Sequence, residues 1–159
     1  MGISFVPSII DDFVLKDYKN EDIKSIDFRG KWIVLYFYPK DGTAGCTKEA
    51  NDFSSLIDDF LKEETVVIGI SPDKTETHKK FILKNNLKII LLSDPEKVLI
   101  EKLGVWQIKQ MYGKQYYGVS RTTFLLDSEM NVRYIWEKVH VNGHAQTVLE
   151  KLIELKTNK

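Results

Sequence analysis

Eight consecutive residues, KWIVLYFY at positions 31–38, constrain the fold more than any other stretch of this chain. After the first lysine they are all aliphatic or aromatic, with no polar residue at alternate positions. A strand with this pattern is buried on both faces of its sheet. Pro39 ends the run, since proline lacks the N–H that a sheet interior needs. We therefore expect a central strand that is covered on both sides.

The segments that follow alternate between helical and extended patterns. Apolar side chains recur at helical spacing over 47–63, and a more polar helix is predicted over 75–85. TVVIGIS at 65–71 and KIILLSD at 88–94 are two more apolar strands. This order of elements predicts parallel strands that are joined by crossover helices.

A short helix is predicted from Asp94 to Leu103. We expect Asp94 to act as its N-cap and Pro95 to be its first helical residue, because these residue types favour those positions. The segment over 13–28 fits either a small hairpin or a loop packed on the edge of the sheet.

The last third of the chain has a different pattern. VSRTTFLLD at 119–127 and NVRYIWE at 131–137 are separated by the short polar turn SEM, which predicts an antiparallel hairpin. A final helix is predicted over 144–155. Together these elements predict an α/β fold with a central mixed β-sheet flanked by helices.

The length of 159 residues suits one domain, which we expect to span residues 1–159. Lys and Arg together number 23, as do Asp and Glu, so no excess positive charge favours nucleic acid or an anionic membrane as a partner. The N-terminus MGISFVPSII lacks the basic start of a secretory signal, and one cysteine cannot form an internal disulfide. The cytoplasm is the expected location.

That single cysteine, Cys46, lies between the end of the central strand and the start of the first predicted helix. A helix N-terminus presents unpaired N–H groups and a positive dipole, which favour the thiolate over the thiol. The commoner role of an unpaired cysteine is to fill space as a small buried residue. Its neighbours shift the balance toward a reactive role, because Gly42 and Gly45 permit close backbone approach, Thr43 offers a hydroxyl, and Pro39 can exclude water. The same residue types also occur in any loop between a strand and a helix, so the sequence leaves both roles open.

Pro39, Thr43 and Cys46 fit the Pro-x-x-x-Thr-x-x-Cys motif of the peroxiredoxins. FYPKDGTAGCTKEANDF resembles this motif as it occurs in the bacterioferritin comigratory protein, or peroxiredoxin Q, subfamily. Further blocks resemble the same subfamily in matching order: GKWIVLYFYPKD, VIGISPDKTETHKKF, LLSDPEK, GVSRTTFLLD and NGHAQTVLEKL. The resemblance implies a thioredoxin-like fold and a thiol-dependent peroxidase that reduces hydrogen peroxide and small alkyl hydroperoxides without a cofactor or metal.

The resemblance also implies a role for four residues. Cys46 would be the nucleophile that attacks the peroxide and becomes a sulfenic acid. Thr43 and the Cys46 N–H would bind the peroxide, and Pro39 would shield the sulfur. Arg121 would supply the cation. By spacing alone, an edge-strand arginine whose head reaches solvent is slightly favoured for Arg121.

The chain departs from the subfamily at Asn51. Many members have a resolving cysteine at this position, five residues after the nucleophile. The sulfenic acid would therefore have to be reduced by an external thiol, such as thioredoxin, glutaredoxin or a low-molecular-weight thiol. The sequence leaves open whether the protein is a monomer or a homodimer.

The three histidines are further candidates for a metal ligand or a catalytic base. The four-residue spacing of His140 and His144 suits a metal only on a continuous helix, and Gly143 intervenes, so a structural role is favoured. His78 is expected at the surface of a polar helix. A base for Cys-His hydrolysis would have to be one of these three, and no pattern places any of them beside Cys46.

Two further features stay open at this point. SPD at 71–73 is interpreted as a turn. An exposed aromatic loop could shape a peroxide pocket or a docking surface, or its side chains could be core: Trp106, Tyr112, Tyr116 and Tyr117. The competing function is a thioredoxin-fold redox sensor that passes its oxidation to a partner protein.

Overall fold

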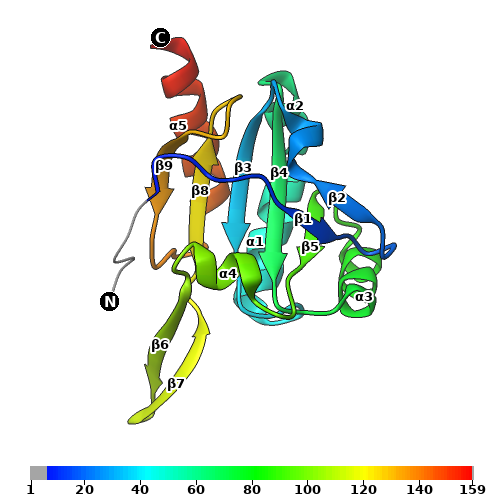
Figure 1. Cartoon of the computed structure of the whole chain (residues 1–159), viewed down its shortest axis with the longest axis vertical. Helices are drawn as coiled ribbons and strands as arrows, with labels where there is room; N and C mark the ends of the chain where they lie inside the picture. The colour runs from blue at the N-terminus through cyan, green and yellow to red at the C-terminus, as the bar shows by residue number, and fades with distance from the viewer. Residues whose placement is uncertain (1–6, 159) are drawn as a thin grey trace.

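The computed structural model describes residues 7–158. Most of the stretch MGISFVPSII, which is expected not to be a secretory signal, lies outside this range. A seven-stranded sheet forms the centre of the molecule (Figure 1). In spatial order its strands are β2 (Asp22–Lys24), β1 (Val14–Lys16), β5 (Ile90–Ser93), β4 (Thr65–Ser71), β3 (Trp32–Phe37), β8 (Thr122–Leu126) and β9 (Val132–Trp136).

The sheet is mixed, as predicted. β3, β4 and β5 run parallel, whereas β8 and β1 pair antiparallel with β3 and β5, and β9 and β2 extend the two edges. The ambiguous segment over 13–28 forms the β1–β2 hairpin and a short 3-10 helix, η1 (Ser25–Phe28). The hairpin predicted over 119–137 is β8 and β9, although each strand is shorter than expected.

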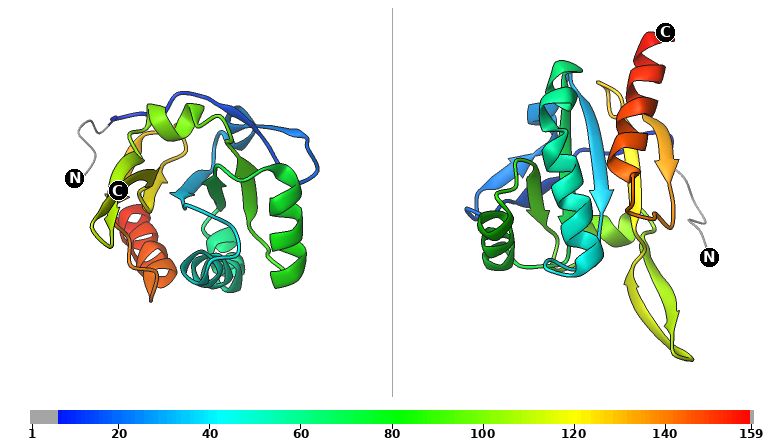
Figure 2. Two further views of the ribbon diagram at one scale, coloured as in Figure 1. Left: turned by 90° about the horizontal axis from the view of Figure 1, so that it is seen from below. Right: turned by 180° about the vertical axis from the view of Figure 1, so that it is seen from behind.

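Helices cover both faces of the sheet (Figure 2). One face carries α1 (Ala44–Ser55), α2 (Ile57–Lys62), α3 (Thr75–Asn85) and α5 (His144–Thr157). The other face carries α4 (Val98–Lys102) and the chain that leads into β1. None of the helices within residues 7–158 is long and apolar enough to cross a membrane.

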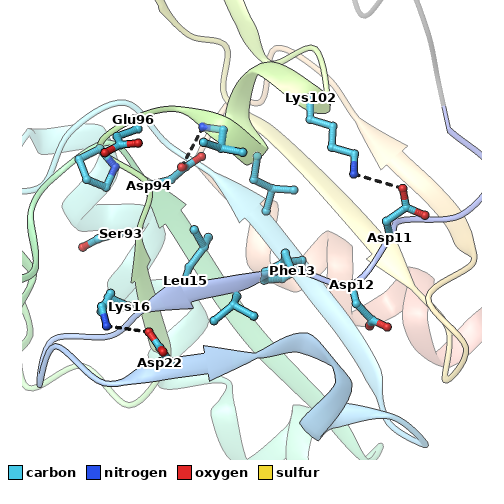
Figure 3. A pocket seen from close by; sticks show the side chains of 14 residues that line it. Asp11, Asp12, Phe13, Leu15, Lys16, Asp22, Ser93, Asp94, Glu96 and Lys102 are labelled. Carbon is cyan, nitrogen blue, oxygen red and sulfur yellow. Dashed lines mark hydrogen bonds and ion pairs between the residues drawn. The ribbon is translucent and has the colours of Figure 1, made fainter.

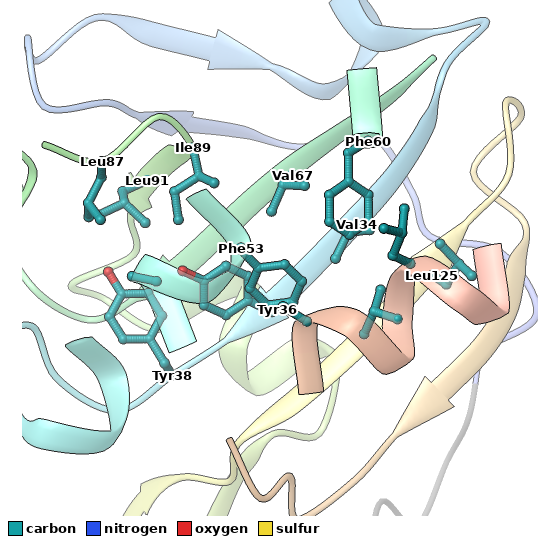
Figure 4. Close-up of a cluster of buried hydrophobic side chains, with 14 of the residues drawn as sticks. Val34, Tyr36, Tyr38, Phe53, Phe60, Val67, Leu87, Ile89, Leu91 and Leu125 are labelled. Carbon is teal, nitrogen blue, oxygen red and sulfur yellow. The ribbon is translucent and has the colours of Figure 1, made fainter. Parts of the chain in front are cut away.

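The central strand β3 contributes to the core on both faces, as its apolar run predicts. All six of its residues are buried. Trp32, Val34 and Tyr36 join the cluster under α1 and α5, part of which is drawn in Figure 4. Ile33, Leu35 and Phe37 join the cluster under α4. The alternation follows from strand geometry, which sends successive side chains to opposite faces.

Tyr36 packs between the sheet and α1, and a glycine on the neighbouring strand leaves space for its ring. Its ring stacks on Phe53 of α1 with 4.8 Å between ring centroids (Figure 4). Tyr36 is paired with Gly69 of β4, where an added Cβ would lie 2.7 Å from the tyrosine Cζ. Only glycine leaves this space on the neighbouring strand, so the packing of Tyr36 fixes the base on which the first helix lies.

The single helix predicted over 47–63 is two helices in the structure. It begins earlier, at Ala44, and breaks at Leu56 between α1 and α2. Paired serines precede the break, and the Oγ of Ser54 accepts a hydrogen bond from the Lys88 N–H at 2.6 Å. Serine pairs are a common cause of helix kinks. The spacing of apolar residues could not predict this contact, because its partner is distant in the sequence.

The prediction that Pro95 begins a helix is wrong. α4 begins at Val98, and Lys97 at its N-cap position has φ of 61°. Asp94 still caps the helix, but from farther away: its carboxylate accepts hydrogen bonds from the N–H groups of Val98 at 3.0 Å and Ile100 at 2.9 Å. The capping chemistry was correctly predicted and its position was not.

The aromatic segment predicted as a loop is a second, two-stranded sheet. β6 (Trp106–Met111) pairs antiparallel with β7 (Lys114–Val119), and the hairpin extends away from the rest of the molecule (Figure 1). Tyr112 at its turn is 96% exposed and Tyr117 is 61% exposed, so these rings are not core residues. Trp106 stacks on Tyr117 and also packs against the cluster under α4.

We predict that Gly69→Ala lowers the free energy of unfolding by about 1–3 kcal/mol, because the new methyl group meets the Tyr36 ring and Leu91. Urea denaturation measures this change. Gly118→Ala is the matched control: it adds the same methyl to another strand, where the nearest atom is the flexible Lys109 Cδ at 3.1 Å. Equal losses in the two variants would contradict the proposed packing role of Gly69.

Candidate active site

Cys46 is the third residue of α1, and Thr43 is the N-cap residue of this helix. The first helical hydrogen bond runs from the Thr47 N–H to the Thr43 carbonyl, so the Cys46 N–H is one of the groups without an intrahelical acceptor. Only 1% of the cysteine is exposed. It lies on the inward face of the helix, as its spacing from Phe53 predicted.

Arg121 brings a permanent positive charge to this sulfur. It lies immediately before β8 rather than inside the strand, and its side chain is 17% exposed. Nη2 lies 3.4 Å from Cys46 Sγ, and Nη1 donates a hydrogen bond to Glu49 Oε1 at 2.7 Å. The guanidinium therefore faces the helix start rather than solvent, contrary to the reading that spacing alone favoured.

Glu49 is the site residue that the sequence reasoning missed. It is 1% exposed and lies one turn after Cys46 on the same helix face. Burial raises the pKa of Glu49 to about 7, although the charge and hydrogen bond of Arg121 act against this shift. Among the described residues, Oε2 has no hydrogen-bond partner, which explains why burial is only partly offset. The sequence feature that could have identified Glu49 was its acidic side chain on an otherwise apolar helix face.

The ion pair with Glu49 also changes the pKa of Arg121. Burial opposes the charged form, but Glu49 and Cys46 together raise the pKa of Arg121 above its ordinary value. The guanidinium thus stays charged while two groups compete for its donors. Its planar fork lets one nitrogen reach the sulfur and the other reach the carboxylate.

Gly45 leaves the space that Arg121 occupies. A Cβ at this position would lie 3.3 Å from Nη2 of Arg121, closer than most side-chain contacts. The expectation that the glycines before Cys46 permit close approach therefore holds for Gly45. Gly42 has a different task, since its φ of 82° lies in the left-handed region that favours glycine.

Thr43 and Pro39 border the same loop. The Thr43 hydroxyl donates a hydrogen bond to the Lys40 carbonyl at 3.0 Å and makes no cap bond to its helix. Its oxygen lone pairs are left to accept a hydrogen bond. Pro39 is half-buried at the carboxyl end of β3. The structure thus places both residues on the segment between the central strand and Cys46.

Lys109 of the projecting hairpin interacts electrostatically with this region. Its Nζ donates a hydrogen bond to the Val119 carbonyl at 2.8 Å. Burial and then the charge of Arg121 lower the pKa of Lys109, whereas Cys46 raises it. The hairpin, whose segment was predicted as an aromatic loop, therefore carries a second cation whose charge interacts with Cys46 and Arg121.

His144 has the structural role that was expected. It is the first residue of α5, 6% exposed, and its Nε2 is hydrogen-bonded to Thr123 Oγ1 at 2.8 Å. Burial, and then the charge of Arg121, lower the pKa of His144 to about 4. The ring is neutral at physiological pH and sits edge-on to Phe53 and Trp136. His140 is exposed in the loop before the helix.

The prediction that His78 lies at the surface is wrong. It is completely buried on the inner side of α3, one turn before Phe81. His78 is bonded to Asp41, and the ligand atoms of His78, Asp41 and Asp73 lie within 4.8 Å of one another. They could in principle hold a cation, but each already has protein partners. The polar residues around His78 concealed its burial.

A separate cavity lies on the other side of the molecule, between β1 and α4 (Figure 3). Its volume is about 470 Å³, and its lining includes Phe13, Leu15 and Leu99. None of the four predicted site residues lines it. The chemistry of Cys46 therefore does not use this cavity.

The geometry around Cys46 suits an attack by a thiolate on an electrophilic oxygen. The sulfur lies at a helix start, in contact with a guanidinium. Negative charge that moves from the sulfur to a departing oxygen would stay within reach of these donors.

Residues 6–135 match the model of the AhpC/TSA family. The chain belongs to this family. Peroxiredoxin Bcp of Bacillus subtilis is 45% identical over 144 residues, which cover 91% of this chain and 92% of that protein. Peroxiredoxin Bcp of Xanthomonas campestris is 44% identical over 123 residues, which cover 77% of each chain.

Solved structures of this peroxiredoxin's relatives have the same fold. A cysteine-to-serine variant of Xanthomonas campestris Peroxiredoxin Q superposes with a TM-score of 0.85 at 39% identity, covering 89% of this chain and 90% of that one. The bacterioferritin comigratory protein from the same organism has a TM-score of 0.86 at 36% identity and covers 97% of this chain and 98% of that one. The predicted thioredoxin-like fold is confirmed.

This peroxiredoxin is accordingly a thiol-dependent peroxidase of the bacterioferritin comigratory protein subfamily, in a version with one cysteine. The chain has one thiol, that of Cys46. Asn51, the position at which the subfamily resemblance implies a resolving cysteine, is exposed on α1.

The lowered pKa of His144 predicts a pH-dependent stability. Between its ordinary pKa of 6.5 and about 4, the unfolded chain binds a proton that the folded protein does not. Acidification through this range therefore favours unfolding, by at most about 3 kcal/mol for the shift given. Urea denaturation at several pH values measures the loss.

His144→Gln is the reference for this measurement. The raised pKa of Glu49 acts in the opposite direction, since its folded form keeps a proton up to about pH 7. Comparing wild type with His144→Gln at each pH cancels this effect. We expect wild type to lose stability relative to the variant as the pH falls; a difference that is constant from pH 7 to pH 4 would contradict the prediction.

Proposed function

We propose that Cys46 is the peroxidatic nucleophile and that Arg121, Thr43 and Pro39 complete the site. The observation that carries this proposal is the 3.4 Å contact between Arg121 Nη2 and the sulfur, made by side chains 75 positions apart. The Arg121 side chain is only 17% exposed and lies against the only cysteine of the sequence. Stabilising the thiolate and the negative charge of the reaction is a role that fits this position.

The reaction begins with the attack of the Cys46 thiolate on one peroxide oxygen. A sulfur–oxygen bond forms as the oxygen–oxygen bond breaks, so the sulfur loses two electrons and the peroxide gains them. The departing oxygen takes up a proton and leaves as water or an alcohol. Arg121 stabilises the charge through this step. Thr43, whose own proton is donated to the Lys40 carbonyl, accepts a hydrogen bond from the peroxide O–H.

An external thiol completes the cycle. It attacks the sulfenic acid, releases water and leaves a mixed disulfide, which a second thiol then reduces to restore Cys46. Thioredoxin, glutaredoxin and low-molecular-weight thiols all supply this chemistry. The absence of a second cysteine in the sequence supports an external route. A disulfide between two copies of the chain would have to join Cys46 to Cys46.

We propose hydrogen peroxide and small alkyl hydroperoxides as substrates. The structure of the Xanthomonas campestris relative is described in terms of its alkyl peroxide reduction activity. The sulfur here is 1% exposed, which favours small substrates. A redox sensor that hands its oxidation to one partner protein is the competing function, and the family relationship favours turnover.

We further propose that residues 1–159 act as one peroxiredoxin domain in the cytoplasm, as a monomer or homodimer. The central sheet draws strands from both ends of the chain, which supports one folding unit. A lone cysteine suits a reducing compartment.

We predict that Cys46→Ser abolishes peroxide consumption in the presence of dithiothreitol. We expect Arg121→Lys to reduce the rate about 10- to 100-fold, because lysine cannot contact both the sulfur and Glu49 with a planar fork. A peroxide assay under excess thiol measures both changes. Peroxide consumption by Cys46→Ser at the wild-type rate would exclude Cys46 as the nucleophile.

We predict that one equivalent of peroxide adds one oxygen atom to the protein, with no intramolecular disulfide. Intact-protein mass spectrometry should show this sulfenic acid, and thioredoxin, glutaredoxin or a small thiol, added one at a time, should remove it at different rates. The fastest identifies the recycling partner. A stable mixed disulfide with one protein and no turnover would instead favour the sensor.

A further inference from the structure

Asp41 is held from three directions in the loop that carries Pro39 and Thr43. Its carboxylate, 2% exposed, accepts a hydrogen bond from the Tyr38 hydroxyl at 2.6 Å. Its second oxygen lies 2.6 Å from His78 Nδ1. Its own N–H donates to the Asp73 carboxylate at 2.8 Å. These partners come from the end of β3, from α3 and from the segment after β4.

His78 is itself fixed at both ring nitrogens. Nε2 lies 3.1 Å from the Leu92 carbonyl of β5, which can only accept, so Nε2 carries a proton. One further proton must lie between Nδ1 and the carboxylate of Asp41, because two lone pairs at 2.6 Å would repel. The ring thus ties the loop to α3 and to the sheet at once.

Besides Asp41, the residues that follow it are held mainly by the start of α1, where the Thr43 carbonyl accepts the first helical hydrogen bond. Gly42, Thr43 and Ala44 are all exposed, so burial does not hold them. The hydroxyl of Thr43 depends on the carbonyl of Lys40, the residue before Asp41. Displacing Asp41 would therefore move the group that orients Thr43, whereas Cys46 is buried within α1 and is held separately by its own packing.

We propose that Asp41 and His78 are positioning residues for the peroxide reaction, acting through the loop that presents Thr43. This inference rests on the proposed role of Cys46 and extends it to a network that has no hydrogen bond to the sulfur in the described structure. The network orders the peroxide-binding side of the site, while Arg121 and Glu49 serve the sulfur side. Loss of the network should slow reactions that need the peroxide to be held and spare those that need only the thiolate.

The test compares two reactions of the same sulfur under single-turnover conditions: oxidation by hydrogen peroxide and alkylation by iodoacetamide. In Asp41→Ala and His78→Leu, the peroxide rate constant should fall about tenfold or more, since small displacements of positioning groups have effects of this size. The alkylation rate should stay within about threefold, because alkylation needs no group that orients a peroxide. Lys79→Gln, at an exposed position of α3, should change neither rate.

Asp41→Asn tests whether geometry is what matters. Its amide oxygen can accept from Tyr38, and its N–H can donate to Nδ1 of a neutral His78, so every bond of the network can be kept. We expect it to retain more than about a third of the wild-type peroxide rate. Tyr38→Phe keeps the ring in the core and removes one bond, so a smaller loss of about threefold is expected even if Asp41→Ala or His78→Leu fails to fold.

The following results would overturn the inference: a folded Asp41→Ala or Tyr38→Phe with the wild-type peroxide rate, equal losses of oxidation and alkylation, or an Asp41→Asn as slow as Asp41→Ala. Circular dichroism establishes that each variant is folded. Failure of the proposed function looks different, since Cys46→Ser would then react with peroxide as wild type does.

Discussion

The guanidinium of Arg121 is the constraint on which the site depends, because it bridges two groups of α1 from another part of the chain. It contacts Cys46 Sγ at 3.4 Å and Glu49 Oε1 at 2.7 Å. Glu49 is buried and Arg121 lowers its pKa, so removing the arginine would leave the carboxylate uncompensated and raise its pKa further. The main effect of the ion pair is therefore to fix the position of the guanidinium rather than to add stability. The cation is thereby held beside the sulfur.

The sheet places these groups within reach. β3 and β8 are antiparallel neighbours, so the end of β3 that leads to the Cys46 loop lies beside the start of β8, where Arg121 is found. Two glycines then permit close packing: Gly69 leaves space for the Tyr36 ring against which α1 packs, and Gly45 leaves space for the guanidinium. The arrangement of the site thus depends on the strand order and on the absence of a side chain at these two positions.

Apolar patterns predicted the framework because each of them depends only on neighbours in the sequence. The runs that became β3 and β4, and the position of Cys46 in the first turn of a helix, follow directly from such local rules. Buried polar residues could not be located in this way. Glu49 and His78 lie inside the protein beside distant partners, Arg121 and Asp41, and no local pattern in the sequence identifies a partner. The β6–β7 hairpin was not predicted because neither of its strands shows a regular alternation of buried and exposed residues.

Two buried polar networks therefore flank the same helix start, and each does what the other cannot. In the proposed mechanism Arg121, held by Glu49, stabilises the charge of the sulfur, which its guanidinium contacts. Among the described residues, Tyr38, Asp41 and His78 make no hydrogen bond to the sulfur and instead hold the loop that precedes it. A reactive anion and an ordered approach to it are separate requirements of the reaction. Because different residues from different elements meet them, either could change in a relative of this protein while the other is kept.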